Sequence, residues 1–169
     1  MPAAPFPAWL LRCLATLALA GLCACNAYPR DPEQTLARVQ GGVLHAGVVH
    51  DPPFVVLAPG QAPSGPEVRL VEAFAARHDA RVDWQVGTHD RLMQRLEDFG
   101  LDLVVGGTAP DSPWKKRVAL SEPFRDLDES GTPVMRVLAL PPGENAWQLD
   151  VEAYLRSDAA RAHLASDAR

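Results

Sequence analysis

Cysteine is missing from most of this chain. The sequence has 169 residues and three cysteines, and all of them, Cys13, Cys23 and Cys25, lie close to the N-terminus. The sequence that follows can therefore form no disulfide of its own. The fold of the sequence after Cys25 must therefore be stabilised by its apolar core and its polar contacts.

A basic surface stripe is also missing. The net charge is −5 at pH 7, and the only cationic run is Lys115–Arg117. Proteins that bind nucleic acids usually gather Lys and Arg on one face, often interleaved with aromatic residues. The composition therefore excludes nucleic acid as a partner.

Cofactor and metal motifs are absent too. The sequence has no phosphate-binding loop, no glycine-rich nucleotide fingerprint and no nucleophile elbow, so we predict no cofactor. His45 and His50 are an odd number of residues apart on a predicted strand and point to opposite faces. His78, His89 and His163 fall in different predicted elements without ligand spacing. We therefore predict no metal site.

The N-terminus contains a short apolar run rather than a membrane span. The run Leu14–Leu22 follows Arg12 and is too short to cross a bilayer, which is typical of a secretory signal. The next residues, Leu22–Cys25, resemble a bacterial lipobox, whose final cysteine receives a lipid. We predict a lipoprotein signal peptide at residues 1–24 and lipidation of Cys25. A plain secreted protein is the alternative.

The lipobox resemblance implies a periplasmic protein that meets the membrane through its lipid anchor only. Asn26, rather than Asp, follows the cysteine and favours the outer membrane. Residues 25–41 are polar and irregular and predict a tether between anchor and domain. Residues 42–169 remain as one domain, which is long enough to bury a core.

The domain sequence alternates between strand and helix patterns. Short apolar runs bounded by turn residues predict strands, and apolar residues at helical spacing predict helices. Such an order, with short loops, predicts an α/β fold with a mostly parallel sheet flanked by helices. The predicted strands cover 42–50, 81–87, 101–107 and 136–143, and the predicted helices 63–80, 88–99 and 144–166.

Several motifs stand in a specific order between Val43 and Phe124. They are "DPPF" after the first strand, a glycine before the first long helix, then "GLDLVVGG" and "SEPF". In this order they resemble the extracellular solute-binding proteins that deliver amino acids and related solutes to ABC importers. The resemblance implies a periplasmic-binding-protein-like fold and a role in solute binding for transport or sensing.

The chain departs from that family in its length after Phe124. Family members have two lobes, and the chain crosses to the second lobe after the "SEPF" element. Residues 125–135 are all that separate this element from the predicted return strand, and they are too few to form a lobe. We therefore predict a single solute-binding-protein-like lobe at residues 42–169.

Five residues are candidate ligand contacts, because ligands bind beyond the carboxyl ends of strands in such sheets. In the family an Arg seven residues before the Ser of "SEPF" holds the carboxylate of the solute, and here that position is Trp114. The alternatives are that Phe54 shapes a strand end, that Trp114 covers the core, and that Lys115–Arg117 is a solvated helix end. The candidates are His50, Asp51, Phe54, Thr108 and Trp114.

The sequence does not favour catalysis. Acid–base chemistry could draw on Asp51, Glu72, Asp102 or Glu122 together with His50. Asp102 stands in a strand-like run and is more typical of a hydrogen-bonding residue at a strand end. A single open lobe also excludes water poorly. We therefore predict that the protein is not an enzyme.

Two non-catalytic functions remain open, and a third hypothesis is a remnant that has kept no activity. In the first, the lobe binds a small polar or aromatic solute on its open edge. In the second, it has lost solute binding and contacts a protein partner, or a second copy of itself, across the face where the other lobe would lie. The second hypothesis predicts an exposed apolar patch on that face.

Overall fold

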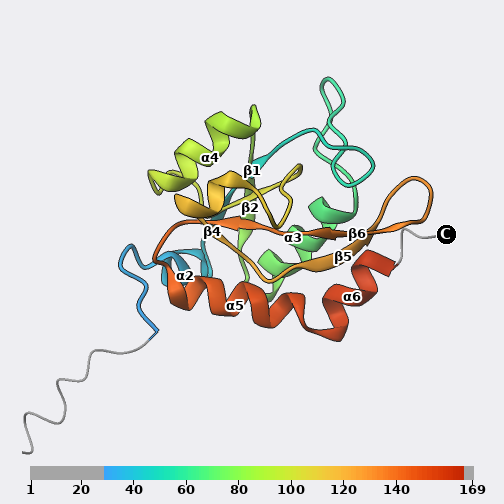
Figure 1. The fold of residues 1–169 in the computed structure, drawn as a ribbon. Coiled ribbons are helices and arrows are strands. Elements are labelled where there is room, and N and C mark those ends of the chain that lie inside the picture. The colour runs from blue at the N-terminus through green and yellow to red at the C-terminus, as the bar shows by residue number, and fades with distance from the viewer. Residues whose placement is uncertain (1–28, 166–169) are drawn as a thin grey trace, which may run out of the picture.

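The computed structural model describes residues 29–165, which form one α/β unit (Figure 1). The predicted signal peptide, Cys25 and Asn26 lie outside the described residues. None of the helices between residues 29 and 165 is long and apolar enough to cross a membrane.

A five-stranded sheet forms the centre, in the strand order β2-β1-β3-β7-β4. Strand β1 pairs in parallel with β2 and β3, whereas β7 runs antiparallel to its neighbours β3 and β4. All strands except β7 therefore run in the same direction, and the predicted α/β class with a mostly parallel sheet is confirmed. The bounds are Val43–Val48 for β1, Arg81–Val86 for β2, Leu103–Val105 for β3, Ala119–Leu120 for β4 and Ala139–Leu140 for β7.

Helices cover both faces of this sheet (Figure 1). Helices α2, α3, α5 and α6 share one apolar core with Leu44 and Leu103 of the sheet. Helix α4 packs on the other face against Val104 and Ala139. The bounds are Thr35–Val39 for α2, Pro66–Arg77 for α3, His89–Glu97 for α4, Asn145–Leu155 for α5 and Asp158–Ala165 for α6.

Trp147 is the centre of the larger core. Its side chain is fully buried, and its ring lies 5.3 Å from that of Phe74. The indole N–H donates to the carbonyl of Asp102 over 2.8 Å, so the polar atom of this large residue is satisfied. Trp147 thereby joins α5, α3 and the residue before β3.

The segment after Phe124 forms an antiparallel ribbon rather than an irregular link. Strand β5 (Phe124–Leu127) pairs with β6 (Pro133–Arg136). In the turn, the carboxylate of Asp128 accepts the N–H groups of Ser130 and Thr132 over 2.9 Å each. The predicted strand 136–143 is wrong in its bounds, because its first residue belongs to this ribbon and β7 begins only at Ala139.

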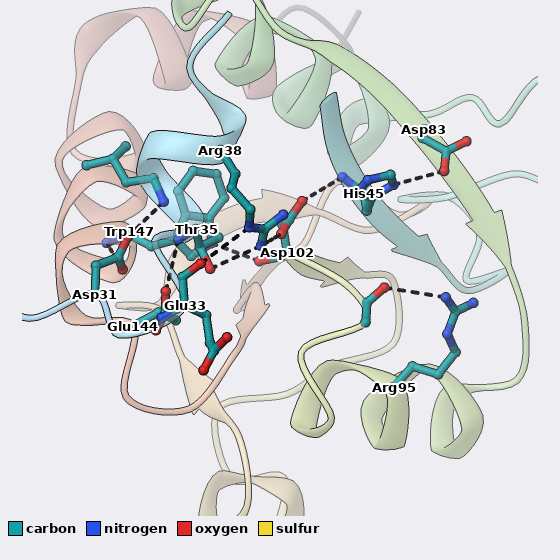
Figure 2. A network of polar contacts seen from close by, with 12 residues as sticks. Asp31, Glu33, Thr35, Arg38, His45, Asp83, Arg95, Asp102, Glu144 and Trp147 are labelled. Carbon is teal, nitrogen blue, oxygen red and sulfur yellow. Dashed lines mark hydrogen bonds and ion pairs between the residues drawn. The ribbon is translucent and has the colours of Figure 1, made fainter. Parts of the chain in front are cut away.

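The predicted tether also needs correction, since its second half belongs to the folded unit. Helix α2 lies within residues 25–41, and its Thr35 and Val39 are buried. Two carboxylates cap two helix starts reciprocally. Glu144 accepts the N–H groups of Glu33 and Thr35, and Asp31 accepts those of Leu36 and Trp147 (Figure 2).

Asp102 organises the same edge of the sheet, where the parallel strands begin. It is buried, and its carboxylate accepts the backbone N–H of His45 and a guanidinium N–H of Arg38, each over 2.8 Å (Figure 2). Beside it, Nδ1 of His45 on β1 lies 3.1 Å from a carboxylate oxygen of Asp83 on β2. Asp102 therefore holds α2 against the sheet, which agrees with the hydrogen-bonding role expected from the sequence.

We expect Glu144→Ala to lower the free energy of unfolding by about 1–3 kcal/mol. The change removes the acceptor of two backbone N–H groups, one of which is buried. Urea denaturation of the purified protein measures the effect. Glu72→Ala is the matched control, because Glu72 is exposed on α3, and it should change stability by less than about 0.5 kcal/mol. Equal costs for the two variants would contradict the capping role.

Candidate functional site

The carboxyl ends of β1, β2 and β3 meet at one edge of the sheet, and the loops that follow them form its rim. The rim consists of residues 49–57, 87–88 and 106–114. The five predicted contact residues stand in the first and third of these loops. The structure divides them into two groups and leaves His50 outside both.

The first group surrounds Arg136, which the sequence analysis did not select. Arg136 lies at the end of β6, and its side chain is 12% exposed. Its Nε donates to Glu67 over 2.6 Å, and its Nη2 donates to Asp51. The guanidinium carbon lies 4.2 Å from the centre of the Phe54 ring. One cation therefore joins the ribbon, the start of α3 and the loop after β1.

The carboxylates around Arg136 are also bound to the third loop. Glu67 is fully buried and accepts the N–H of Gly106 over 3.0 Å, while Asp51 accepts the N–H of Gly107 over 2.8 Å. Gly106 has a φ of 92°, and a Cβ there would lie 2.4 Å from the carbonyl oxygen of Val49. Only glycine allows this close approach of the backbone.

The charges of this cluster depend on one another. Burial alone would lower the pKa of Arg136, but its hydrogen bonds and ion pairs with Glu67 and Asp51 raise it above the ordinary value. Burial raises the pKa of the Glu67 carboxyl, and Arg136 opposes that rise. The predicted ligand residues Asp51 and Phe54 thus have internal partners, and their contact with a solute stays a prediction.

The second group is Thr108 and Trp114, and Trp114 lines a hollow of about 430 Å³ at the rim. The indole N–H of Trp114 donates to Asp90 over 3.3 Å, and Ser112 accepts the backbone N–H of Trp114 over 3.4 Å. Thr108 is buried beneath the rim, with its hydroxyl 3.3 Å from Nε2 of His89. The hollow is lined by His89, Asp90, Gly107, Ala109, Asp111, Ser112, Pro113 and Trp114.

The cationic run after Trp114, residues 115–117, does not line the hollow. Lys115 and Lys116 are exposed at the end of the 3₁₀ helix Pro113–Lys116. Arg117 lies over the Trp114 ring at 4.8 Å and donates from Nε to Glu97 over 2.9 Å. The run is therefore the solvated helix end that the sequence analysis offered as one alternative.

His50 has a structural contact within its own loop. The side chain is exposed, and Nδ1 accepts the N–H of Leu57 over 3.1 Å. The acid–base candidates do not meet at one site: Glu72 is exposed on α3, and Glu122 pairs with Arg156 over 2.7 Å. Among residues 29–165 no cluster of three or more His, Asp or Glu side chains could hold a metal ion.

Solved structures share this fold. A mutant of the arginine-bound domain 1 from TmArgBP matches with a TM-score of 0.62 and 24% identity, covering 72% of this chain and 95% of that one. An ancestral cationic amino acid solute-binding protein matches with a TM-score of 0.66 and 13% identity, over 80% of this chain and 99% of that one. A periplasmic binding protein of Salmonella typhimurium with high arginine specificity matches with a TM-score of 0.61 and 10% identity, covering 73% of this chain and 98% of that one.

These likenesses establish the fold of a periplasmic-binding-protein lobe. The match to an isolated first domain agrees with the resemblance drawn from the motifs and with the single lobe. No family model matches the sequence. No curated protein matches it either.

We expect Arg136→Met to cost about 3–5 kcal/mol of stability, because it leaves two carboxylates without their cation in a largely buried site. Chemical denaturation gives this value. The same change in a Glu67→Gln background should cost less, since the amide still accepts a hydrogen bond but carries no charge. Arg125→Met is the control, because Arg125 is exposed on the neighbouring strand. Identical costs in both backgrounds would disprove the charge coupling.

A pH dependence should arise from Asp126 on strand β5 of the ribbon. Asp126 is buried, its Oδ2 has no hydrogen-bond partner among the described residues, and burial raises its pKa. The folded state then holds this proton more tightly than the unfolded state, whose Asp titrates at about 3.9. Stability relative to Asp126→Asn should therefore fall as pH rises from about 4, and level off above the folded pKa. Denaturation across this range tests it, and a constant difference would refute it.

Proposed function

We propose that this lobe binds a small polar or aromatic solute at its rim, without catalysis, for transport or sensing. The hollow beside Trp114 is the observation that carries the proposal. It lies where the parallel strands end, which is the usual position of ligands in such sheets. The solved neighbours with this fold include an arginine-bound single domain.

A single lobe is compatible with this role. The ribbon β5–β6 is closed by the Asp128 turn, so the fold needs no second lobe to join these two strands. Domain 1 from TmArgBP, at 24% identity, has itself been solved in an arginine-bound form. Most of the residues around the hollow are exposed, so we expect weaker binding than in a closed cleft.

The cellular setting that we propose rests on the N-terminal sequence. A signal peptide at residues 1–24 and a lipid on Cys25 would anchor the protein in the periplasm, with the outer membrane favoured by Asn26. The periplasmic binding proteins among the structural neighbours support the compartment.

A protein-interaction module is the second candidate function, and one observation favours it. An apolar hollow of about 460 Å³ lies between the ribbon and the last two helices. Its apolar lining includes Phe124, Leu127, Leu155 and Leu164. Such a surface beside the ribbon fits a protein partner or a second copy of the chain better than a polar solute.

Titration of the purified protein with amino acids, amines, organic acids and aromatic solutes separates the two functions. Solute binding predicts saturation, and stabilisation by about 2.7 kcal/mol at a hundredfold excess over Kd. Trp114→Ala should weaken the best solute tenfold or more, because it removes the aromatic wall of the hollow.

Trp84→Ala is the control for this titration, since Trp84 lies on β2 and packs against the core rather than the hollow. The comparison uses Kd and not the thermal midpoint, because both tryptophans contribute to packing. A flat titration of well-folded protein would reject solute binding and leave the interaction surface as the function to pursue.

A further inference from the structure

We infer that the solute is an organic cation without a carboxylate, such as an alkyl amine or an alkyl guanidine. The inference rests on the proposed solute-binding function and narrows its ligand class. It depends on the charges that line the rim hollow, on the partners of the cations beside it, and on the aromatic wall.

The lining of the hollow is acidic. The side chain of Asp90 is 88% exposed, and Asp111 is exposed as well, so both carboxylates are accessible to a solute. No Lys or Arg is among the described residues that line the hollow. A cation placed there gains two favourable charge interactions, whereas an anion is repelled by both.

Lys115 and Lys116 are exposed after Trp114 and do not line the hollow. The two arginines described beside the rim, Arg117 and Arg136, are bound to carboxylates. Arg117 binds the carboxylate of Glu97 through both Nε and Nη2. Arg136 is held between Glu67 and Asp51. A carboxylate on the solute would therefore meet Asp90 and Asp111, and no Lys or Arg among the described lining residues would pair with it. An amino acid would lose more from its carboxylate than it gains.

Trp114 favours the same ligand class. Its ring lines the hollow, and the bond from its indole N–H to Asp90 connects the aromatic wall to a carboxylate. The guanidinium of Arg117 already lies over this ring, at 4.8 Å from its centre. An ammonium or guanidinium group between the ring and the carboxylates would combine a cation–π contact with charge pairing.

Two pairs of ligands that differ only by a carboxylate test the inference: arginine with agmatine, and lysine with cadaverine. Calorimetric titration of the purified protein should give a Kd at least tenfold lower for each amine than for its amino acid. Rising salt should weaken the amines, because the lining charges are exposed.

Charge-neutral variants locate the effect. Asp90→Asn and Asp111→Asn should each raise the Kd of agmatine about fivefold or more, and neither position is buried, so folding should be preserved. Glu72→Gln removes an exposed carboxylate on α3, away from the hollow, and should leave the Kd unchanged.

The outcomes separate the inference from the proposed function. Arginine binding as tightly as agmatine, or binding of neutral or anionic solutes alone, would overturn the inference and leave solute binding intact. Agmatine binding that both Asn variants leave unchanged would also overturn it, because the cation would then lie outside this hollow. If no solute of the wider panel binds, the proposed function fails and the inference fails with it.

Discussion

The ion pairs of Arg136 are the constraint on which the rim depends. One guanidinium holds Glu67 and Asp51, and these carboxylates in turn bind the backbone of Gly106 and Gly107. Loops that follow two different strands are thereby fixed against the ribbon. The geometry of the hollow beside Gly107 thus follows from a cation that does not line it.

The ribbon β5–β6 connects β4 to β7 of the central sheet. Here a five-residue turn at residues 128–132 reverses the chain, and its Asp128 satisfies the turn's backbone donors. Arg136, the last residue of the ribbon, then lies at the rim, so the connection between β4 and β7 also supplies the cation that joins the rim loops.

Much of this architecture can be predicted from the sequence. Helix α3 has apolar residues at helical spacing, and β1 to β3 are short apolar or alternating runs. The carboxyl ends of these strands place the rim and Trp114 at one edge of the sheet. Arg136 could not be found in this way, because it pairs with Asp51 across 85 residues and sequence spacing says nothing about such contacts. The acidic lining could be predicted in part, because His89 and Asp90 stand at the start of the predicted helix 88–99, directly after the predicted strand 81–87. Helix α2 was missed because it is five residues long and is stabilised by caps from a distant carboxylate, Glu144.

The reciprocal caps of Asp31 and Glu144 also fix the point at which the chain enters the lobe. They hold α2 beside α5, at the edge where the parallel strands begin (Figure 1). The hollow lies at the opposite edge, where these strands end. A force applied to the chain before Asp31 would therefore reach the lobe at the edge of the sheet opposite to Trp114. If the lobe is attached through this end, the hollow faces away from the point of attachment.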